Sequence, residues 1–126
     1  MEQKSNYSKE ELLIVADEGF DGAGNGKLPT PPMLMVDRIL QIFEDGGAFN
    51  KGYILAELDI IPDHWFFDCH FKDDPVMAGS LMAEGCVQLL QFFLLHLGLQ
   101  TLVEDATFQP IHGLPQIVRC RGQVIP

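Results

Sequence analysis

The stretch from Asp68 to Leu99, DCHFKDDPVMAGSLMAEGCVQLLQFFLLHLGL, decides how the rest of the chain folds. It starts with a histidine in an aromatic, irregular segment and passes Pro75 and Gly79 before a long apolar run. Proline cannot lie inside a helix, glycine lets backbone N–H groups approach a ligand, and serine can cap a helix. These residues predict that a helix starts near Ser80, which caps it, and Gly98 predicts its end.

Apolar side chains cover almost every direction of this helix, a pattern that is typical of a helix buried on all sides. Polar residues interrupt the run, and its apolar pieces are far shorter than the roughly 18 residues that a membrane span needs. We therefore expect a core helix and exclude a membrane span. The apolar residues are Leu81, Met82, Val87, Leu89, Leu90, Phe92, Phe93, Leu94, Leu95 and Leu97.

One polar stripe runs along this helix. Glu84, Gln88 and Gln91 follow an i, i+4, i+7 spacing, so they share one face. A buried carboxylate needs a partner or takes up a proton, because an isolated buried charge is very costly. The stripe is thus either a polar network, with Glu84 satisfied by Gln88, or a working site. His70, just before the glycine turn, favours chemistry.

Composition limits the class of protein. The chain has 126 residues and is 47% hydrophobic, which predicts one domain spanning residues 1–126. With 8 basic and 18 acidic residues the formal net charge is −10, and no basic stripe appears, so nucleic acid is excluded as a partner. The three cysteines, Cys69, Cys86 and Cys120, have no short paired spacing, and no secretory leader precedes them. We expect a cytoplasmic location and buried, structural cysteines.

The remaining elements follow from local patterns. Ser8 and Glu11 form a capping-box pair that predicts a helix from Lys9 to about Asp17. Met33 to Phe43 has strand composition, and the turn sequence Asp45-Gly46-Gly47 follows it.

Two further strands are expected. Alternation from Gly52 to Ile60 completes a hairpin with a half-buried second strand, and alternation from Gln116 to Val124 predicts a third long strand. A hairpin, a helix and a strand predict an α+β fold whose sheet covers the helix. Three strands are few for this, so we expect either a second chain or further strands after Pro126 to complete the sheet.

A family likeness rests on WFFDCHFKDDPVMAGSLMAEGCVQ together with LPTPPMLMVDR, KGYILAELDI and RCRGQVIP. From about Tyr7 to Pro126 the chain resembles the β-hydroxydecanoyl-acyl-carrier-protein (FabA-type) dehydratases, including the dehydratase domains of polyunsaturated fatty acid synthases. The resemblance implies a hotdog fold, an antiparallel β-sheet wrapped around a long central helix, whose last strands lie beyond residue 126. It also implies a homodimer that acts on acyl carrier protein thioesters, with sites shared between subunits.

The resemblance also assigns roles to residues. It makes His70 and Glu84, 84 − 70 = 14 positions apart, the catalytic pair, with Gln88 and Val76 in support. The Gly79 N–H matches the group that holds the thioester carbonyl. The Ser80 N–H beside it is also free at the helix start.

Two positions depart from the family pattern. Ala78 replaces a proline. Glu84 replaces the aspartate of the dehydratase/isomerase branch and is similar to the dehydratase-only branch, which argues against isomerase activity.

The chemistry expected is loss of water from a 3-hydroxyacyl thioester in fatty acid biosynthesis. His70 is the expected base, because histidine is the side chain best suited to proton transfer near neutral pH, and we expect Trp65, Phe67 and Phe71 to screen it from solvent. Glu84, in its apolar setting, is the expected acid, which donates a proton to the leaving hydroxyl. No metal or organic cofactor is expected, because the substrate arrives on the phosphopantetheine of the carrier. Candidates for an acyl tunnel, each also suited to the core, are Met77, Leu81, Val87, Phe92 and Phe93.

Two other functions remain open. A hotdog thioesterase uses Glu84 to activate water and has no need of His70. An inactive hotdog unit instead serves as a scaffold or dimerisation element of a synthase. A metal site built from His64, His70, Asp63 and Asp68 lacks ligand spacing, so no metal site is expected, and His64, His96 and His112 are expected to be surface or packing residues.

Overall fold

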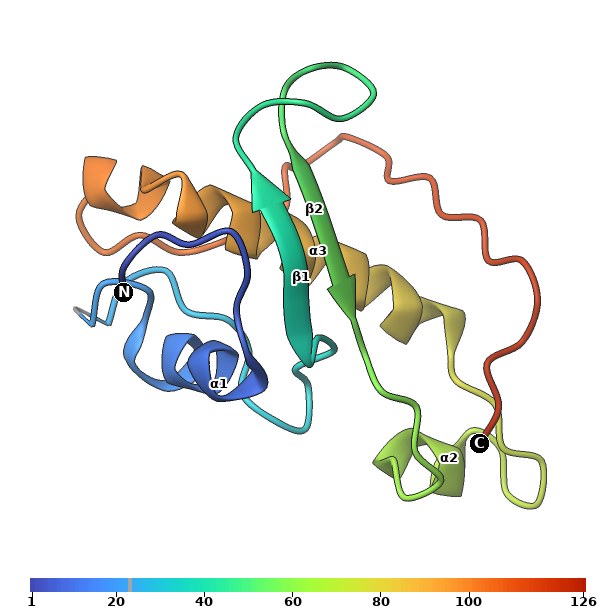
Figure 1. Ribbon diagram of the computed structural model, residues 1–126. Helices are drawn as coiled ribbons and strands as arrows, with labels where there is room; N and C mark the ends of the chain where they lie inside the picture. The colour runs from blue at the N-terminus through green and yellow to red at the C-terminus, as the bar shows by residue number, and fades with distance from the viewer. Residues whose placement is uncertain (23) are drawn as a thin grey trace.

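The computed structural model describes residues 1–22 and 24–126. A two-stranded antiparallel sheet and one long helix dominate it, and Figure 1 shows the helix crossing behind the two strands. This α+β arrangement is consistent with the expected hotdog fold. The elements are α1 (Lys9–Glu18), β1 (Arg38–Phe43), β2 (Tyr53–Glu57), α2 (Trp65–Cys69), α3 (Gly79–His96) and the 3₁₀ helix η1 (Leu99–Leu102).

The first helix forms where its cap predicts. The Ser8 hydroxyl accepts the Glu11 N–H at 3.3 Å, and the Glu11 carboxylate accepts the Ser8 N–H at 2.9 Å. This reciprocal pair satisfies two N–H groups that a helix start leaves free. Leu12, Val15 and Ala16 are buried, so the capped helix packs one face into the core.

The hairpin is shorter than the sequence predicts. β1 pairs with β2 from Arg38 opposite Glu57 to Phe43 opposite Tyr53, with an irregularity between Ile39 and Gln41. The expected strand from residue 33 is wrong in its first five residues, because residues 33–37 form a loop before β1. The half-buried character of the second strand is confirmed, since exposed and less exposed residues alternate along β2, but the strand ends at Glu57 and the expected continuation to Ile60 is wrong.

The long helix begins and ends where expected but is capped differently. α3 starts at Gly79, and the residue that caps it is Ala78. The expectation that the Ser80 side chain caps the helix is therefore wrong, since Ser80 already lies in the first turn. At the other end Gly98 has a φ of 78°, a left-handed conformation that glycine adopts without cost and that ends the helix.

Burial of α3 on all sides, another expectation, is also wrong. Its buried residues are Gln88, Phe92, Leu95 and His96, while Leu90 is 59% exposed. One side faces the sheet and α1, and the opposite side is only partly covered, by residues 108–116 across a cavity. The apolar pattern predicted contacts on every side, but it could not show how closely other segments pack there.

Two apolar clusters hold these elements together. The larger one joins α1, β1 and α3 around Tyr7. The ring of Tyr7 packs edge-on against the rings of Phe92 and Phe20, with distances between ring centroids of 4.8 and 6.1 Å. Its hydroxyl lies 3.0 Å from His96 Nδ1, which fits the expected packing role of this histidine. The smaller cluster, formed by Met35, Phe66, Phe67 and Met77, fixes α2 beside the start of α3.

The expected third strand, residues 116–124, is wrong. In the described part of the chain this segment has no regular secondary structure and is mostly exposed. Figure 1 shows it returning, in red, towards α2 and the start of α3. There the Val124 carbonyl accepts the Met77 N–H at 2.8 Å. Alternation describes two unequal faces, but a strand also needs a neighbour for its N–H and C=O groups.

None of the helices described, within residues 1–22 and 24–126, is both long and apolar enough to span a membrane.

Candidate active site

His70 lies directly after the five-residue helix α2 and is clamped to Val76. Its Nδ1 atom lies 2.8 Å from the Val76 carbonyl oxygen, and its own carbonyl accepts the Val76 N–H at 2.8 Å. A carbonyl oxygen can only accept a hydrogen bond, so Nδ1 carries the ring proton. The neutral imidazole therefore keeps its lone pair on Nε2, where it can act as a base.

The aromatic residues expected around His70 divide into two groups. Phe71 stacks on the imidazole at 4.2 Å, but its own side chain is 56% exposed. Phe67 is a buried residue of α2, whereas the Trp65 indole N–H donates to the Pro32 carbonyl at 3.1 Å. In this chain α2 is anchored firmly, and His70 remains partly accessible.

The start of α3 supplies free backbone donors. The Leu81 and Met82 N–H groups bond to the Ala78 carbonyl at 3.0 and 3.3 Å, and Gly79 and Ser80 come just before them. The first N–H groups of a helix have no acceptor within it and lie at the positive end of its dipole. They form an arrangement that suits the oxygen of a thioester.

Gln88 holds the carboxylate of Glu84. Its Nε2 donates to Glu84 Oε1 at 2.9 Å and to the Met33 carbonyl at 3.0 Å, and its Oε1 accepts the Met35 N–H at 2.7 Å. The side chain of Gln88 is fully buried. The bond between Gln88 and Glu84 that the polar-network alternative requires is present, and a catalytic role of Glu84 stays a prediction. The loop partners Met33 and Met35 were missed, because the sequence places them in a strand.

Residues 28–126 match the family model of the FabA-like domain. The chain belongs to this family. FabA-like domains form a hotdog-fold enzyme family of the dehydratase/isomerase type.

His70 and Glu84 of the FabA-like domain have separate supports. His70 bonds to Val76, Glu84 bonds to Gln88, and no hydrogen bond joins the two within the described residues. The two side chains are thus held separately within one chain, and both their catalytic roles and their meeting across two subunits stay predictions.

The candidates for an acyl tunnel do not line a single space. Met77 and Leu81 line a cavity of about 260 Å³ between α3 and β2. Val87 lines a different cavity with Glu84, and Phe93 lines a third, next to the hairpin. Phe92 is 1% exposed and packs against Tyr7, so it is a core residue.

The cysteines of the FabA-like domain differ from expectation. All three are exposed, so the prediction that they are buried is wrong. Cys120 reaches its position because residues 116–124 lie over the start of α3, with its Sγ 3.7 Å from the Gly79 carbonyl. Within the described ranges, no group of three or more His, Cys, Asp or Glu side chains could hold a metal ion.

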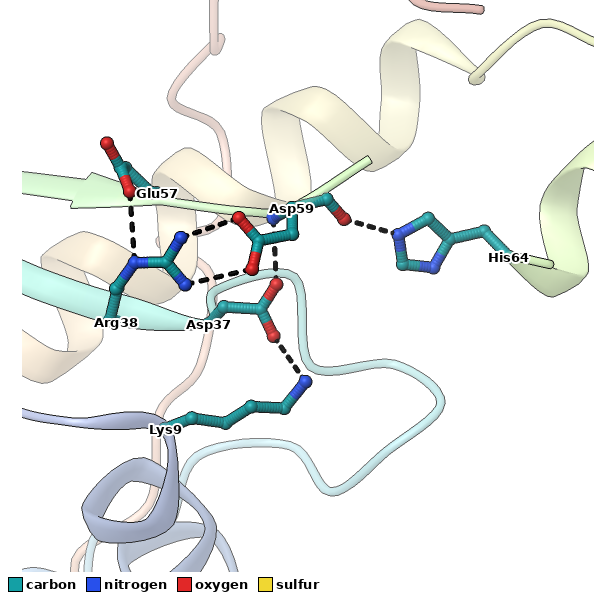
Figure 2. A network of polar contacts seen from close by, with 6 residues as sticks. All are labelled: Lys9, Asp37, Arg38, Glu57, Asp59 and His64. Carbon is teal, nitrogen blue, oxygen red and sulfur yellow. Dashed lines mark hydrogen bonds and ion pairs between the residues drawn. The ribbon is translucent and has the colours of Figure 1, made fainter. Parts of the chain in front are cut away.

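A charged network, drawn in Figure 2, connects the hairpin to α1 and α2. Arg38 makes two hydrogen bonds to the Asp59 carboxylate, at 2.9 and 2.6 Å, and a third to Glu57 at 3.0 Å. The guanidinium lowers the pKa of Asp59. The Asp59 carbonyl in turn lies 2.6 Å from Nε2 of His64, which stacks on Phe66 of α2.

The other half of this network reaches α1. Asp37 accepts the Asp59 N–H at 2.8 Å and pairs with Lys9 at 2.8 Å, which raises the pKa of Lys9. The network thus fixes the chain on both sides of the hairpin and at His64, the residue that comes directly before α2. The sequence offered one signal for it, the charged pair Asp37-Arg38 at a strand start.

Proposed function

We propose that this protein removes water from 3-hydroxyacyl thioesters carried on acyl carrier protein, giving trans-2-enoyl thioesters in cytoplasmic fatty acid synthesis. The observation that carries the proposal is the orientation of His70. The Val76 carbonyl, 2.8 Å from Nδ1, leaves Nε2 as the basic atom in a chain of the FabA-like family. A base fixed in this way suits abstraction of the proton next to a thioester carbonyl.

The first step breaks the C2–H bond. His70 Nε2 takes the proton, and the electron pair moves towards the thioester carbonyl, whose oxygen becomes negative. The N–H groups of Gly79 and Ser80, at the positive end of α3, stabilise that oxygen. Their geometry is part of the backbone, so it requires no reorganisation during the reaction.

The second step breaks the C3–O bond. Protonated Glu84 gives its proton to the departing hydroxyl, and the C2 electron pair forms the C2=C3 double bond as water leaves. The hydrogen bond from Gln88 to Glu84 Oε1 leaves the second carboxyl oxygen for the substrate. The proton then passes from the imidazolium back to the carboxylate, so the cycle consumes no cofactor.

A direct assay tests the reaction. The protein is incubated with a 3-hydroxyacyl pantetheine thioester while enoyl absorbance and free thiol are recorded. We expect enoyl product from the wild type, a loss of at least about 100-fold in His70→Ala and Glu84→Gln, and no change in the exposed-histidine control His112→Ala. Free thiol that survives His70→Ala supports a thioesterase instead, and absence of both products supports a scaffold.

A mixing experiment tests the shared site. If His70 of one subunit works with Glu84 of the other, a dimer of His70→Ala with Glu84→Gln contains one intact site. Random pairing makes half the dimers mixed, so the mixture should regain about a quarter of wild-type activity. The two inactive variants are unfolded and refolded together. If the mixture stays inactive, this result contradicts the shared site.

A further inference from the structure

The polar stripe on α3 continues beyond the catalytic carboxylate into a large cavity. This cavity, of about 710 Å³, lies between α3 and residues 108–116. Its walls are mainly apolar, with Val87 and Leu94 on the helix and Phe108 and Leu114 opposite them. Glu84 and Gln91 both line it, so two polar side chains of one helix face share the same space.

The amide oxygen of Gln91, Oε1, is a buried polar atom without a partner in the described part of the chain. Leaving such an oxygen unpaired costs about 1–3 kcal/mol, and most buried polar atoms in proteins are paired. Gln88, one turn earlier, shows the contrast, since its amide makes three hydrogen bonds.

The position of Gln91 relative to Glu84 indicates which part of a ligand it meets. Seven helical residues give a rise of about 10 Å along one face. A group bound at Gln91 therefore lies well away from the carbons that react at Glu84. An acyl thioester extends this far in two directions, along its hydrocarbon tail or along its pantetheine arm.

The chemistry of Gln91 distinguishes these directions. A carboxamide offers both donors and an acceptor, and a secondary amide matches both. A hydrocarbon tail offers neither, whereas the pantetheine arm contains two secondary amides. We propose that Gln91 is a substrate-binding residue whose carboxamide hydrogen-bonds an amide of the phosphopantetheine arm. This inference rests on the function proposed above and identifies the part of the substrate that the cavity holds.

Binding of unreactive thioesters tests the inference. Decanoyl-pantetheine has both amides, decanoyl-N-acetylcysteamine has only the nearer one, and neither has a hydroxyl to lose. Affinities are measured by calorimetry for the wild type, Gln91→Met and the control Gln41→Met, which makes the same change at an exposed site on β1. We expect Gln91→Met to lose about tenfold for decanoyl-pantetheine and Gln41→Met to lose nothing.

The two ligands identify the amide. A loss confined to decanoyl-pantetheine supports a bond to the farther amide, and an equal loss for both ligands supports the nearer one. Unchanged affinity of Gln91→Met for both ligands, or no binding to the wild type, overturns the inference. If Gln91→Met does not fold, Gln91→Glu, which removes the donor, replaces it in the same comparison.

Dehydration of 3-hydroxydecanoyl-pantetheine is measured separately on the same proteins. If the wild type is active and its affinity for the thioesters does not depend on Gln91, this inference alone is overturned. An inactive wild type whose binding depends on Gln91 supports the binding site and contradicts the proposed reaction. Thermal unfolding without ligand adds a readout, because a ligand-binding Gln91 predicts that Gln91→Met is at least as stable as the wild type.

Discussion

Replacing Gln88 by methionine should be one of the most destabilising changes on α3. The substitution keeps the length of the side chain but removes its three hydrogen bonds, to the Met35 N–H at 2.7 Å, the Met33 carbonyl at 3.0 Å and Glu84 at 2.9 Å. At about 1 kcal/mol for each bond, the loss is about 3 kcal/mol. Typical domains are stable by only about 5–15 kcal/mol, so this is a large share.

Urea unfolding followed by circular dichroism measures this loss. With a typical slope of about 1–3 kcal/mol per molar urea, the midpoint of Gln88→Met should fall by about 1–3 M. Gln91→Met is the matched control, since the same atoms change three residues further along the helix where no hydrogen bond is lost. Equal midpoints for the two variants, or a loss below about 1 kcal/mol at Gln88, would refute the reasoning.

Two more predictions concern the core. Burial lowers the pKa of His96, so the unfolded chain takes up a proton first as the pH falls below about 6.5, and stability should fall from there down to the folded pKa. Unfolding measured between pH 7 and 5 should show a smaller decline in His96→Gln, and equal slopes contradict the assignment. Gly26→Ala places a Cβ in steric overlap with Leu95 Cδ2, whereas a Cβ at Gly22 meets no atom within 4 Å, and both residues have positive φ. The free energy of unfolding of Gly26→Ala should therefore be about 1–3 kcal/mol lower than that of Gly22→Ala. Equal stability would show that the Leu95 side chain moves aside without cost.

Local signals in the sequence predicted the features that depend on a few neighbouring residues. The capping box at Ser8 and the left-handed end at Gly98 lie where expected, because each is decided by backbone bonds within one turn. The bond between Glu84 and Gln88 follows from helical spacing alone. The same spacing gave the position of Gln91 but could not show that its buried amide oxygen makes no hydrogen bond within the described residues.

Features that depend on distant segments were not predictable in the same way. The loop at Met33 to Met35 gives its N–H and C=O groups to Gln88, 53 residues or more away, instead of to a strand. Residues 116–124 alternate like a strand, yet no strand pairs with them within residues 1–22 and 24–126. An alternating pattern records which face prefers burial, and the presence of a partner strand is information that the pattern does not contain.

The two halves of the proposed site therefore differ in how they are built. His70 and Val76 are joined by a short loop, in which Phe71 and Asp74 exchange backbone hydrogen bonds at 2.8 and 3.0 Å, so the orientation of the imidazole is a local property. The Glu84 carboxylate instead depends on Gln88 and, through it, on a loop from another part of the chain. A change in that loop should disturb the acid directly, through the hydrogen bonds of Gln88, and should reach the base only through packing, where Met35 contacts the cluster of Phe66, Phe67 and Met77. We therefore expect proton donation to the leaving hydroxyl to be the step most sensitive to mutations outside the site.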